Sequence, residues 1–422
     1  MKRVLALVTL FLAGFGLVCC SYSSSGYKPP SGVLTRVLAS QDVSSATSFA
    51  GLWIINGQKD MLAQVAPISA GGNPGLMAIS PTRATLLAFD PSVNRVTIIS
   101  TRAESAVGTV QLTGPTTSMV APITTGFGYA AEPTAVLNGN SPGAVEMMSL
   151  NTGAVLFSVS VPNAQTVIAN PNGTQLLVFS NDSNSVTVVT PNLTTPTLST
   201  TVTVAGFDQP VYGFFSSDGS VAYILNCGAE CHGNQASVQT LNLSTLTPGT
   251  PLPVDGATFG FVKGTTLYVA GISPTNNACT GQTTAATSCG RLDIVDLGSM
   301  TVIGSAVITD GYHDRMDMSL NGQLFIGSHN CTTINNPPTE IRSCLSIYNT
   351  TNESVVVPPA LGDVTGFQSF TTRYVEYVAQ GGGLQIYDTL KDVLQPIQLV
   401  NASGQQTGIT GQVIDVKAID FF

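Results

Sequence analysis

The sequence predicts an all-β protein in which a unit of four strands is repeated along the chain. The clearest unit runs from Gly311 to Pro358 and holds four short pieces rich in Val, Ile, Phe, Tyr and Leu: His313–Ser319, Gln323–Ser328, Cys344–Asn349 and Ser354–Val357. Turn formers such as Asn321-Gly322 separate the pieces, which is typical of consecutive antiparallel strands. One such sheet cannot bury both of its faces, but a series packed around an axis can. We therefore predict a single β-propeller.

The same pattern of four strands separated by turns recurs in seven other units, of which the first lacks one strand. The first unit supplies three expected strands, Arg36–Ser40, Gly51–Gly57 and Asp60–Pro67. The second to fourth units supply Gly75–Ser80, Thr85–Asp90, Arg95–Ser100, Gly108–Thr113, Ser118–Ile123, Gly126–Ala131, Ala144–Leu150, Ala154–Val161, Thr166–Ala169, Gln175–Ser180, Ser185–Thr190 and Thr200–Ala205. The fifth, sixth and eighth supply Val211–Ser216, Val221–Asn226, Ser237–Asn242, Thr250–Val254, Ala257–Lys263, Thr266–Gly271, Arg291–Asp296, Val302–Ile308, Val364–Phe370, Tyr374–Gln380, Gly383–Asp388 and Pro396–Val400.

The two ends of the chain predict how the ring closes. A last strand-like piece, Gln412–Asp420, follows the eighth unit and has no unit of its own. Because the first unit lacks its opening strand, we expect this piece to complete the first blade, which removes two free sheet edges. Roughly 385 residues in eight units give about 48 residues each, close to the usual propeller repeat. Eight blades are favoured, and seven are possible if the irregular first or third unit is miscounted.

Two segments of the sixth unit resemble a known repeat. Thr266–Gly271 reads Thr-Leu-Tyr-Val-Ala-Gly, and Arg291–Asp296 reads Arg-Leu-Asp-Ile-Val-Asp. These segments resemble the strands of YVTN-type propellers, and Gln175–Ser180, Ser185–Thr190 and Leu384–Asp388 echo them. The resemblance covers most of the mature chain as a hydrophobic pattern. It implies the propeller fold and a location in the cell envelope, and it implies no particular activity.

The amino terminus predicts export and a lipid anchor. Lys2-Arg3 precedes the apolar run Val4–Val18, which is typical of a signal peptide spanning residues 1–19. The following Leu17-Val18-Cys19-Cys20-Ser21 resembles the bacterial lipobox, with Cys20 as the acylated residue. Acylation of Cys19 fits the pattern less well, and ordinary secretion without an anchor is the alternative. The resemblance, with Ser after the acylated cysteine, implies attachment to the outer membrane of a Gram-negative bacterium.

Composition separates a tether from the folded domain and excludes one class of partner. Residues 20–35 are rich in Ser, Gly and Pro, which favours a flexible tether, and residues 36–422 form the predicted propeller. Only 9% of the residues are charged. Removal of Lys2 and Arg3 with the signal peptide leaves 13 basic residues against 24 acidic ones, a net charge of −11. An acidic chain without basic clusters excludes nucleic acid as a partner.

Six cysteines of the mature chain predict three local disulfides. They fall in pairs between the second and third strands of three successive units: Cys227 with Cys231, Cys279 with Cys289, and Cys331 with Cys344. Six cysteines allow 15 pairings in principle, but this placement favours the local one. A zinc site would need converging thiolates with another spacing. A haem attachment at Cys227–His232 would have one residue too many between its cysteines, so we predict neither metal nor cofactor.

The disulfides predict where a ligand face lies. Loops between second and third strands share one face of a propeller with the connections between blades, so the three insertions crowd one sector. We expect a possible ligand face there, formed by Tyr312, His313, Asp314, Arg315, His329 and Asn330. A structural role for the Asp314–Arg315 pair, fixing the inner edge of the blade, is the favoured alternative.

Two functions are compatible with the sequence. We favour a non-enzymatic scaffold that is anchored to the membrane and binds a protein or glycan partner, because the chain holds no G-x-S-x-G elbow, phosphate loop or H-E-x-x-H motif. The alternative is a hydrolase or lactonase with its site at the mouth of the central channel. Asp310, His313, Asp314 and Asp363 are the residues that could converge there.

Overall fold

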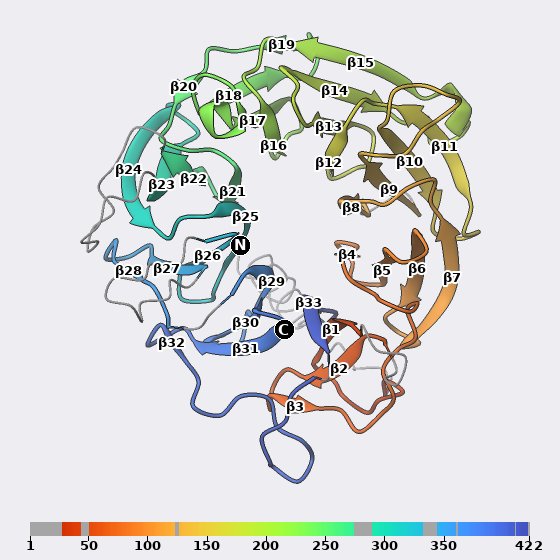
Figure 1. Ribbon diagram of the computed structural model, residues 1–422, viewed down its shortest axis with the longest axis vertical. Helices are drawn as coiled ribbons and strands as arrows, with labels where there is room; N and C mark the ends of the chain where they lie inside the picture. Colours follow the sequence, from red (N-terminus) through yellow and green to blue (C-terminus); the bar gives the residue numbers. More distant parts are fainter. Residues whose placement is uncertain are drawn as a thin grey trace, which may run out of the picture.

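The computed structural model describes residues 28–43, 50–122, 126–273, 289–331, 344–359, 362–409 and 411–420. Their strands form eight sheets arranged as blades around a central axis (Figure 1). The prediction of an eight-bladed β-propeller is confirmed, and the alternative count of seven is wrong. Within these ranges, no helix combines the length and the apolar character needed to cross a bilayer.

Blade 1 is built from both ends of the propeller, as the unpaired tail predicted. From the axis outward it contains β33 (Gln412–Ala418), β1 (Arg36–Asp42), β2 (Trp53–Asn56) and β3 (Met61–Leu62). β1 pairs antiparallel with β33, with Val37 opposite Ala418 and Ala39 opposite Val416. The last strand of the chain therefore supplies the innermost strand of the first blade.

Blades 2 to 4 each follow the simple order of four consecutive strands from the axis outward. Their strands are β4 (Met77–Ile79), β5 (Thr85–Asp90), β6 (Arg95–Ser100), β7 (Ser105–Gln111), β8 (Ser118–Val120), β9 (Phe127–Glu132), β10 (Ala144–Ser149), β11 (Val155–Ser160), β12 (Ala164–Ala169), β13 (Leu176–Ser180), β14 (Ser185–Thr190) and β15 (Thr200–Ala205). A short 3-10 helix, η1 (Pro196–Leu198), precedes β15.

Blades 5 to 8 repeat this order, with one variation in blade 5. There, two short outer strands, β19 and β20, both pair with β18. The strands are β16 (Pro210–Phe215), β17 (Val221–Asn226), β18 (Ser237–Asn242), β19 (Thr247–Pro248), β20 (Leu252–Pro253), β21 (Phe259–Lys263), β22 (Thr266–Ser273), β23 (Cys289–Asp296), β24 (Thr301–Ile308), β25 (Tyr312–Met318), β26 (Gln323–His329), β27 (Leu345–Asn349), β28 (Val355–Val356), β29 (Val364–Ser369), β30 (Val375–Gln380), β31 (Gly383–Asp388) and β32 (Val393–Leu394). The 3-10 helix η2 (Gly228–Cys231) lies between β17 and β18.

The second strand of each blade is buried on both faces. In β13, Leu176 and Val178 pack with residues of blade 3, whereas Leu177 and Phe179 pack with residues of blade 5. Successive side chains of a strand point to opposite faces, so a strand between two neighbouring sheets needs apolar residues at every position. This burial explains why the sequence of β13 is a continuous apolar run.

Two glycines of β26 and its turn show how closely the blades approach. Gly322 has a φ of 83° in the turn that precedes β26, and its N–H donates to the carbonyl of Ser319 at 3.0 Å. This left-handed backbone favours glycine. At Gly327, a Cβ atom would lie 2.6 Å from Val364 of blade 8, so a larger residue would push the two blades apart.

The outermost strands are where the sequence-based boundaries fail. Pro396–Val400 was expected to form the last strand of blade 8, but that strand is β32, at Val393–Leu394. Val400 instead bridges to Met61 of β3, and the N–H of Leu62 donates to its carbonyl at 2.8 Å. An outer strand pairs on one side only and faces solvent, so its apolar pattern constrains its position weakly. The segment therefore forms a second, outer connection between blades 8 and 1.

Arg36 joins three parts of the chain at the closure of the ring. Its Nη2 lies 2.7 Å from Oδ1 of Asp420, and its Nη1 lies 2.8 Å from Oε1 of Glu104 in the turn of blade 2 between β6 and β7. Nη1 also donates to the carbonyl of Thr101 at 2.6 Å. The side chain of Arg36 is only 4% exposed, so the closure rests on a buried ionic cluster.

We expect Arg36→Ala to lower the free energy of unfolding by about 3–5 kcal/mol, because the carboxylates of Glu104 and Asp420 lose their buried cation. Chemical denaturation followed by the fluorescence of Trp53, the only tryptophan of the chain and a residue of blade 1, measures this change. The matched control is Lys391→Ala, which removes an exposed cation 3.5 Å from Asp388 and should cost less than about 1 kcal/mol. Equal effects of the two changes would contradict the prediction.

Candidate functional site

A cavity of about 910 Å³ lies at the face of the ring where the innermost strands begin. Its lining comes from blades 2 to 7, through the first residues of inner strands and through the loops that follow second strands. In a four-stranded blade, these loops and the connections between blades reach the same face. We call this region the channel mouth. Among its polar lining residues are Thr117, Ser118, Gln165, Asn181, Asp182, Gln209, Glu230, His232, Tyr312, Asp314, Arg315 and His329.

Four of the six residues predicted for the ligand face line the channel mouth. Tyr312, Asp314 and Arg315 reach it from β25, and His329 reaches it from the end of β26. His313 is not among the lining residues, and neither is Asn330. The sequence therefore placed four of these residues at the cavity that the structure contains, and whether this face binds a ligand stays a prediction.

A β-bulge in β25 explains why adjacent residues point the same way. The pairing of β25 with β26 shifts between His313 and Arg315, which leaves Asp314 as an extra residue. An extra residue bends the strand and redirects its side chains, so Asp314 and Arg315 both line the cavity. The inner strands β12, β16 and β29 shift at the equivalent place, where the extra residues are Gln165, Val211 and Thr365. Gln165 and Val211 also line the channel mouth.

Asp314 organises the polar wall of blade 7. Its Oδ2 atom lies 3.6 Å from Nδ1 of His329 and 3.3 Å from Nη1 of Arg315. The interaction with the Asp314 carboxylate raises the pKa of His329 above its ordinary value of 6.5. Tyr312 lies beside this pair, with its ring centroid 5.2 Å from that of His329. Burial, and then the charges of Glu230 and Asp314, raise the pKa of Tyr312 to about 12.

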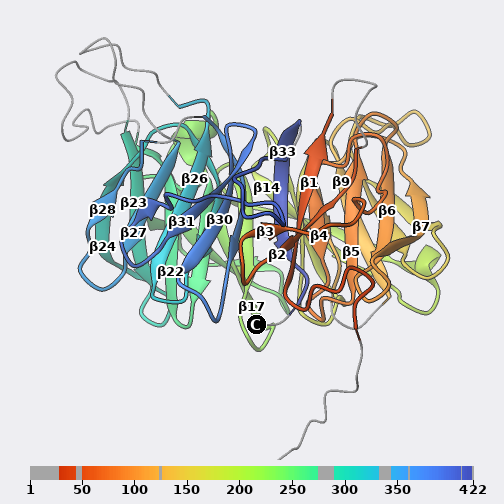
Figure 2. The same ribbon diagram turned by 90° about the horizontal axis from the view of Figure 1, so that it is seen from below.

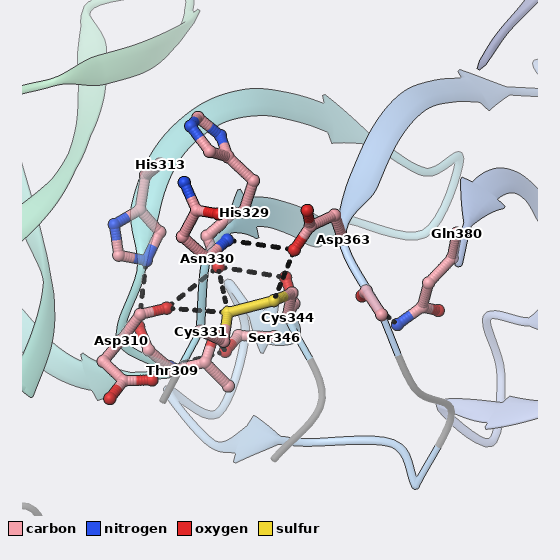
Figure 3. The surroundings of a disulfide bond; sticks show 12 residues. Thr309, Asp310, His313, His329, Asn330, Cys331, Cys344, Ser346, Asp363 and Gln380 are labelled. Carbon is pink, nitrogen blue, oxygen red and sulfur yellow. Dashed lines mark hydrogen bonds between the residues drawn. A yellow bond between two sulfur atoms is a disulfide. The ribbon is translucent and has the colours of Figure 1, made fainter. Parts of the chain in front are cut away.

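His313 has a structural position instead of the predicted ligand-facing one. It is fully buried, and its Nε2 atom lies 2.9 Å from the carbonyl oxygen of Thr309 (Figure 3). Burial lowers its pKa to about 4, so the ring is neutral at pH 7. The N–H of Asn330 donates to Oδ1 of Asp363 at 2.9 Å, which links blade 7 to blade 8. Both residues were expected at the ligand face because they lie beside the Cys331–Cys344 insertion, and the sequence does not show the bulge between His313 and Arg315.

Arg315 also has the structural role that the sequence suggested as an alternative. Its Nε atom donates to the carbonyl of Thr365 in β29 at 3.1 Å, and its Nη1 atom donates to the carbonyl of Asp314 at 2.7 Å. These bonds connect the inner strands of blades 7 and 8. The guanidinium is therefore fixed in place, and it contributes a positive charge to the wall.

Glu230 is the main residue of the channel mouth that sequence reasoning missed. It belongs to η2, inside the Cys227–Cys231 loop, and its Oε2 atom accepts a hydrogen bond from the N–H of Ile272 at 2.7 Å. This bond places the loop of blade 5 over blade 6. Burial raises the pKa of Glu230 to about 7. Its position between two cysteines on the expected face was the available signal.

Two of the three predicted disulfides are present. Cys227 is bonded to Cys231, and Cys331 is bonded to Cys344, with Cα–Cα distances of 5.6 and 5.7 Å. Both lie between a second and a third strand, as predicted: Cys227–Cys231 closes the turn of η2 after β17, and Cys331–Cys344 joins the segment after β26 to the start of β27. The proposed Cys279–Cys289 bond lies outside the residues whose side chains the structure describes. Cys20 also lies outside the described part of the chain.

The four residues suggested for a hydrolase differ in their exposure to the channel mouth. Asp314 lines the channel mouth, but His313 is fully buried and Asp310 is 2% exposed. Asp363 is engaged by the N–H of Asn330. No group of three or more His, Cys, Asp or Glu side chains among the described residues is placed to hold a metal ion. The channel mouth instead combines dispersed polar groups with the rings of Tyr212, Phe259 and Tyr312, an arrangement suited to binding.

Comparison with known proteins supports the propeller fold and assigns no function to the chain. No protein-family model matches the chain, and no curated protein matches its sequence. Solved β-propellers do resemble the structure. The dihydro-heme d1 dehydrogenase NirN, in complex with DHE, has a TM-score of 0.63 and 11% identity over 94% of this chain and 78% of that chain.

Two further structures show the same range of similarity. Hydrazine synthase of Kuenenia stuttgartiensis has a TM-score of 0.54 and 14% identity, over 75% of this chain and 95% of that chain. A candidate 6-phosphogluconolactonase of Bacteroides uniformis has a TM-score of 0.50 and 12% identity, over 91% and 99%. The likeness is one of fold alone. The YVTN repeat and the lipoprotein signal remain predictions.

We expect peptide mapping without reduction to find three local disulfides. Two are the bonds of the structure, Cys227–Cys231 and Cys331–Cys344. The third is Cys279–Cys289, which the pairing of cysteines between second and third strands predicts. Mass spectrometry before and after reduction identifies the linked peptides. A peptide that joins cysteines of two different blades would contradict the prediction.

His329 and His313 should titrate differently. Asp314 raises the pKa of His329, so the His329–Asp314 bond stabilises the fold below pH 6.5 and this contribution is lost as the pH rises through the raised pKa. In Asp314→Asn, NMR should show the midpoint of His329 falling towards or below 6.5. His313, with a pKa of about 4, should not titrate between about pH 5 and 8. An unchanged His329 midpoint in the variant would refute the assigned pairing.

Proposed function

We propose that this protein is a lipoprotein of the bacterial cell envelope that binds a partner at the channel mouth without catalysing a reaction. The observation that carries the proposal is the opposite placement of two features. The chain enters the propeller at one face, and the channel mouth with its disulfide-closed loops lies at the other. A lipid anchor at Cys20 would therefore leave the channel mouth directed away from the membrane.

The entry point is fixed by contacts of the described residues. Ser31 donates its N–H and its hydroxyl to the carboxylate of Glu104, at 2.5 and 2.7 Å. Glu104 lies between the third and fourth strands of blade 2, a connection that reaches the face opposite the channel mouth. Asp420, which follows β33, is bonded to Arg36 at the same face. Figure 2 shows the ring from the side, with β1 rising from the lower face.

The character of the channel mouth supports binding as its function. Disulfides hold the described ends of two of its loops, and three inner strands carry bulges whose extra residues line it. Rigid scaffolds that present loops are common recognition surfaces. The acidic composition disfavours nucleic acid, which leaves a protein or a glycan as the partner.

Replacing Cys20 by Ala tests the anchor. We expect the variant to move from the membrane fraction to the soluble fraction of a Gram-negative host, because no acyl chain is attached. Cys19→Ala is the matched control and should stay in the membrane fraction. Continued membrane attachment of Cys20→Ala would refute the lipoprotein assignment.

Photo-crosslinking in intact cells tests the orientation of the binding face. A photoreactive residue replaces His232, which lies at the channel mouth with its side chain 90% exposed, or Asp218, an exposed residue of the β16–β17 turn at the opposite face. We expect a crosslinked partner from position 232 and none from position 218. Crosslinking from position 218 alone would mean that the other face binds.

A further inference from the structure

We infer that the channel mouth binds a short oligosaccharide, whose hydroxyl groups donate hydrogen bonds to Glu230 and Asp314 and whose ring packs on aromatic side chains. The inference rests on the proposed function, because it names the ligand of the same face. Four observations support it: two carboxylate oxygens without a donor, a mixture of donors and acceptors, aromatic rings in the lining and the balance of charge.

Two carboxylate oxygens of the channel mouth lack a hydrogen-bond donor. Oε1 of Glu230 and Oδ1 of Asp314 are buried atoms without a partner among the described residues. The second oxygen of Glu230 accepts from the N–H of Ile272, and that of Asp314 faces His329 and Arg315. A buried acceptor without a donor is unfavourable. Both residues line the channel mouth, so a small rotation of either carboxylate would present its unpaired oxygen to a ligand hydroxyl, which would supply the missing donor.

The other polar groups distinguish a hydroxylated ligand from a cation. Asn181 donates Nδ2 to Oε1 of Gln165 at 3.3 Å, which leaves the Oδ1 acceptor of Asn181 and the Nε2 donor of Gln165 for a ligand. Gln209 adds a third carboxamide to the lining. An ammonium ion uses acceptors only, whereas each hydroxyl group of a sugar both donates and accepts. The mixed wall therefore fits a sugar better.

Aromatic rings supply surfaces on which a sugar ring can pack. Tyr212 and Phe259 have centroids 4.5 Å apart, and both line the channel mouth. Tyr312 lines it from blade 7. Aromatic side chains contribute large apolar contact areas, which match the C–H faces of a pyranose. A volume of about 910 Å³ is near the upper end of the usual range for small-molecule sites, about 300–1,000 Å³, and is larger than one sugar ring requires.

Charge disfavours an anionic ligand. Arg315 is the only Arg or Lys side chain of the described lining, and its guanidinium is already bonded to the carbonyls of Thr365 and Asp314. Asp182, Glu230 and Asp314 are the acidic residues of the same wall. An acidic polysaccharide or a phosphorylated ligand would meet these carboxylates without a free cation to balance them. We therefore expect an uncharged glycan.

Calorimetric titration of the full-length protein, purified from membranes in detergent, tests the inference. The probes are uncharged di- to tetrasaccharides of the malto-, cello- and N-acetylated chito-series. We expect at least one series to bind with a Kd in the micromolar to millimolar range. Glu230→Gln and Asp314→Asn should each weaken binding about tenfold or more, because each alters an acceptor of the site. Phe259→Leu should weaken it as well, because it removes a ring and keeps an apolar side chain.

Glu353→Gln is the matched control, since Glu353 is exposed in the β27–β28 turn at the opposite face. This variant should bind the sugar with the affinity of the wild type. Thermal unfolding checks that the variants remain folded. No binding at about 10 mM sugar (a ΔG° weaker than about −2.7 kcal/mol), or equal affinities of the wild type and all three cavity variants, would overturn the inference. If tetramethylammonium displaced the sugar, and the same variants weakened its binding, the site would be a cation site instead. A protein crosslinked at position 232 without any sugar binding would refute the glycan and leave the proposed function intact.

Discussion

The antiparallel pairing of β1 with β33 is the interaction on which the rest of the structure depends. Without it, blade 1 would lack its inner strand and blades 1 and 8 would expose their edges and faces to solvent. The pairing brings together residues that are nearly the whole chain apart, and Arg36 secures it with ion pairs to Asp420 and Glu104. Burial alone would lower the pKa of Arg36, but these carboxylates raise it, so the guanidinium stays charged in the closed ring. The outer bridge between Val400 and Met61 adds a second connection.

Closure also determines where polar chemistry can occur. Each sheet is covered by its neighbours on both faces, as the packing of β13 between blades 3 and 5 illustrates. Polar side chains that a ligand can reach therefore lie on outer strands, in turns and at the ends of inner strands. The channel mouth lies at such ends, where bulges in β12, β16 and β25 supply Gln165, Val211 and Asp314 to the lining. A propeller can therefore hold a rigid apolar ring and a polar binding surface within a chain of low charge.

The opposite placement of the entry point and the channel mouth follows from the same topology. Because β33 supplies the inner strand of blade 1, the first strand of the chain occupies the second position of that blade. The chain must then enter at the face where inner strands end, which is the face away from the channel mouth. An anchor joined to this end and a ligand bound at the other face would not compete for space.

Much of the fold could be read from the sequence because it depends on local patterns. The repeat of apolar segments predicted eight blades, the unpaired Gln412–Asp420 predicted the closure, and the placement of the cysteines predicted the bonds Cys227–Cys231 and Cys331–Cys344. The same placement located Tyr312, Asp314, Arg315 and His329 at one face. The tertiary structure decided the rest: the bulge that buries His313 and exposes Asp314, the position of Glu230 over blade 6, and the displaced outer strand β32. Strand alternation is set within a few residues, whereas these features depend on contacts between blades that no short segment of sequence encodes.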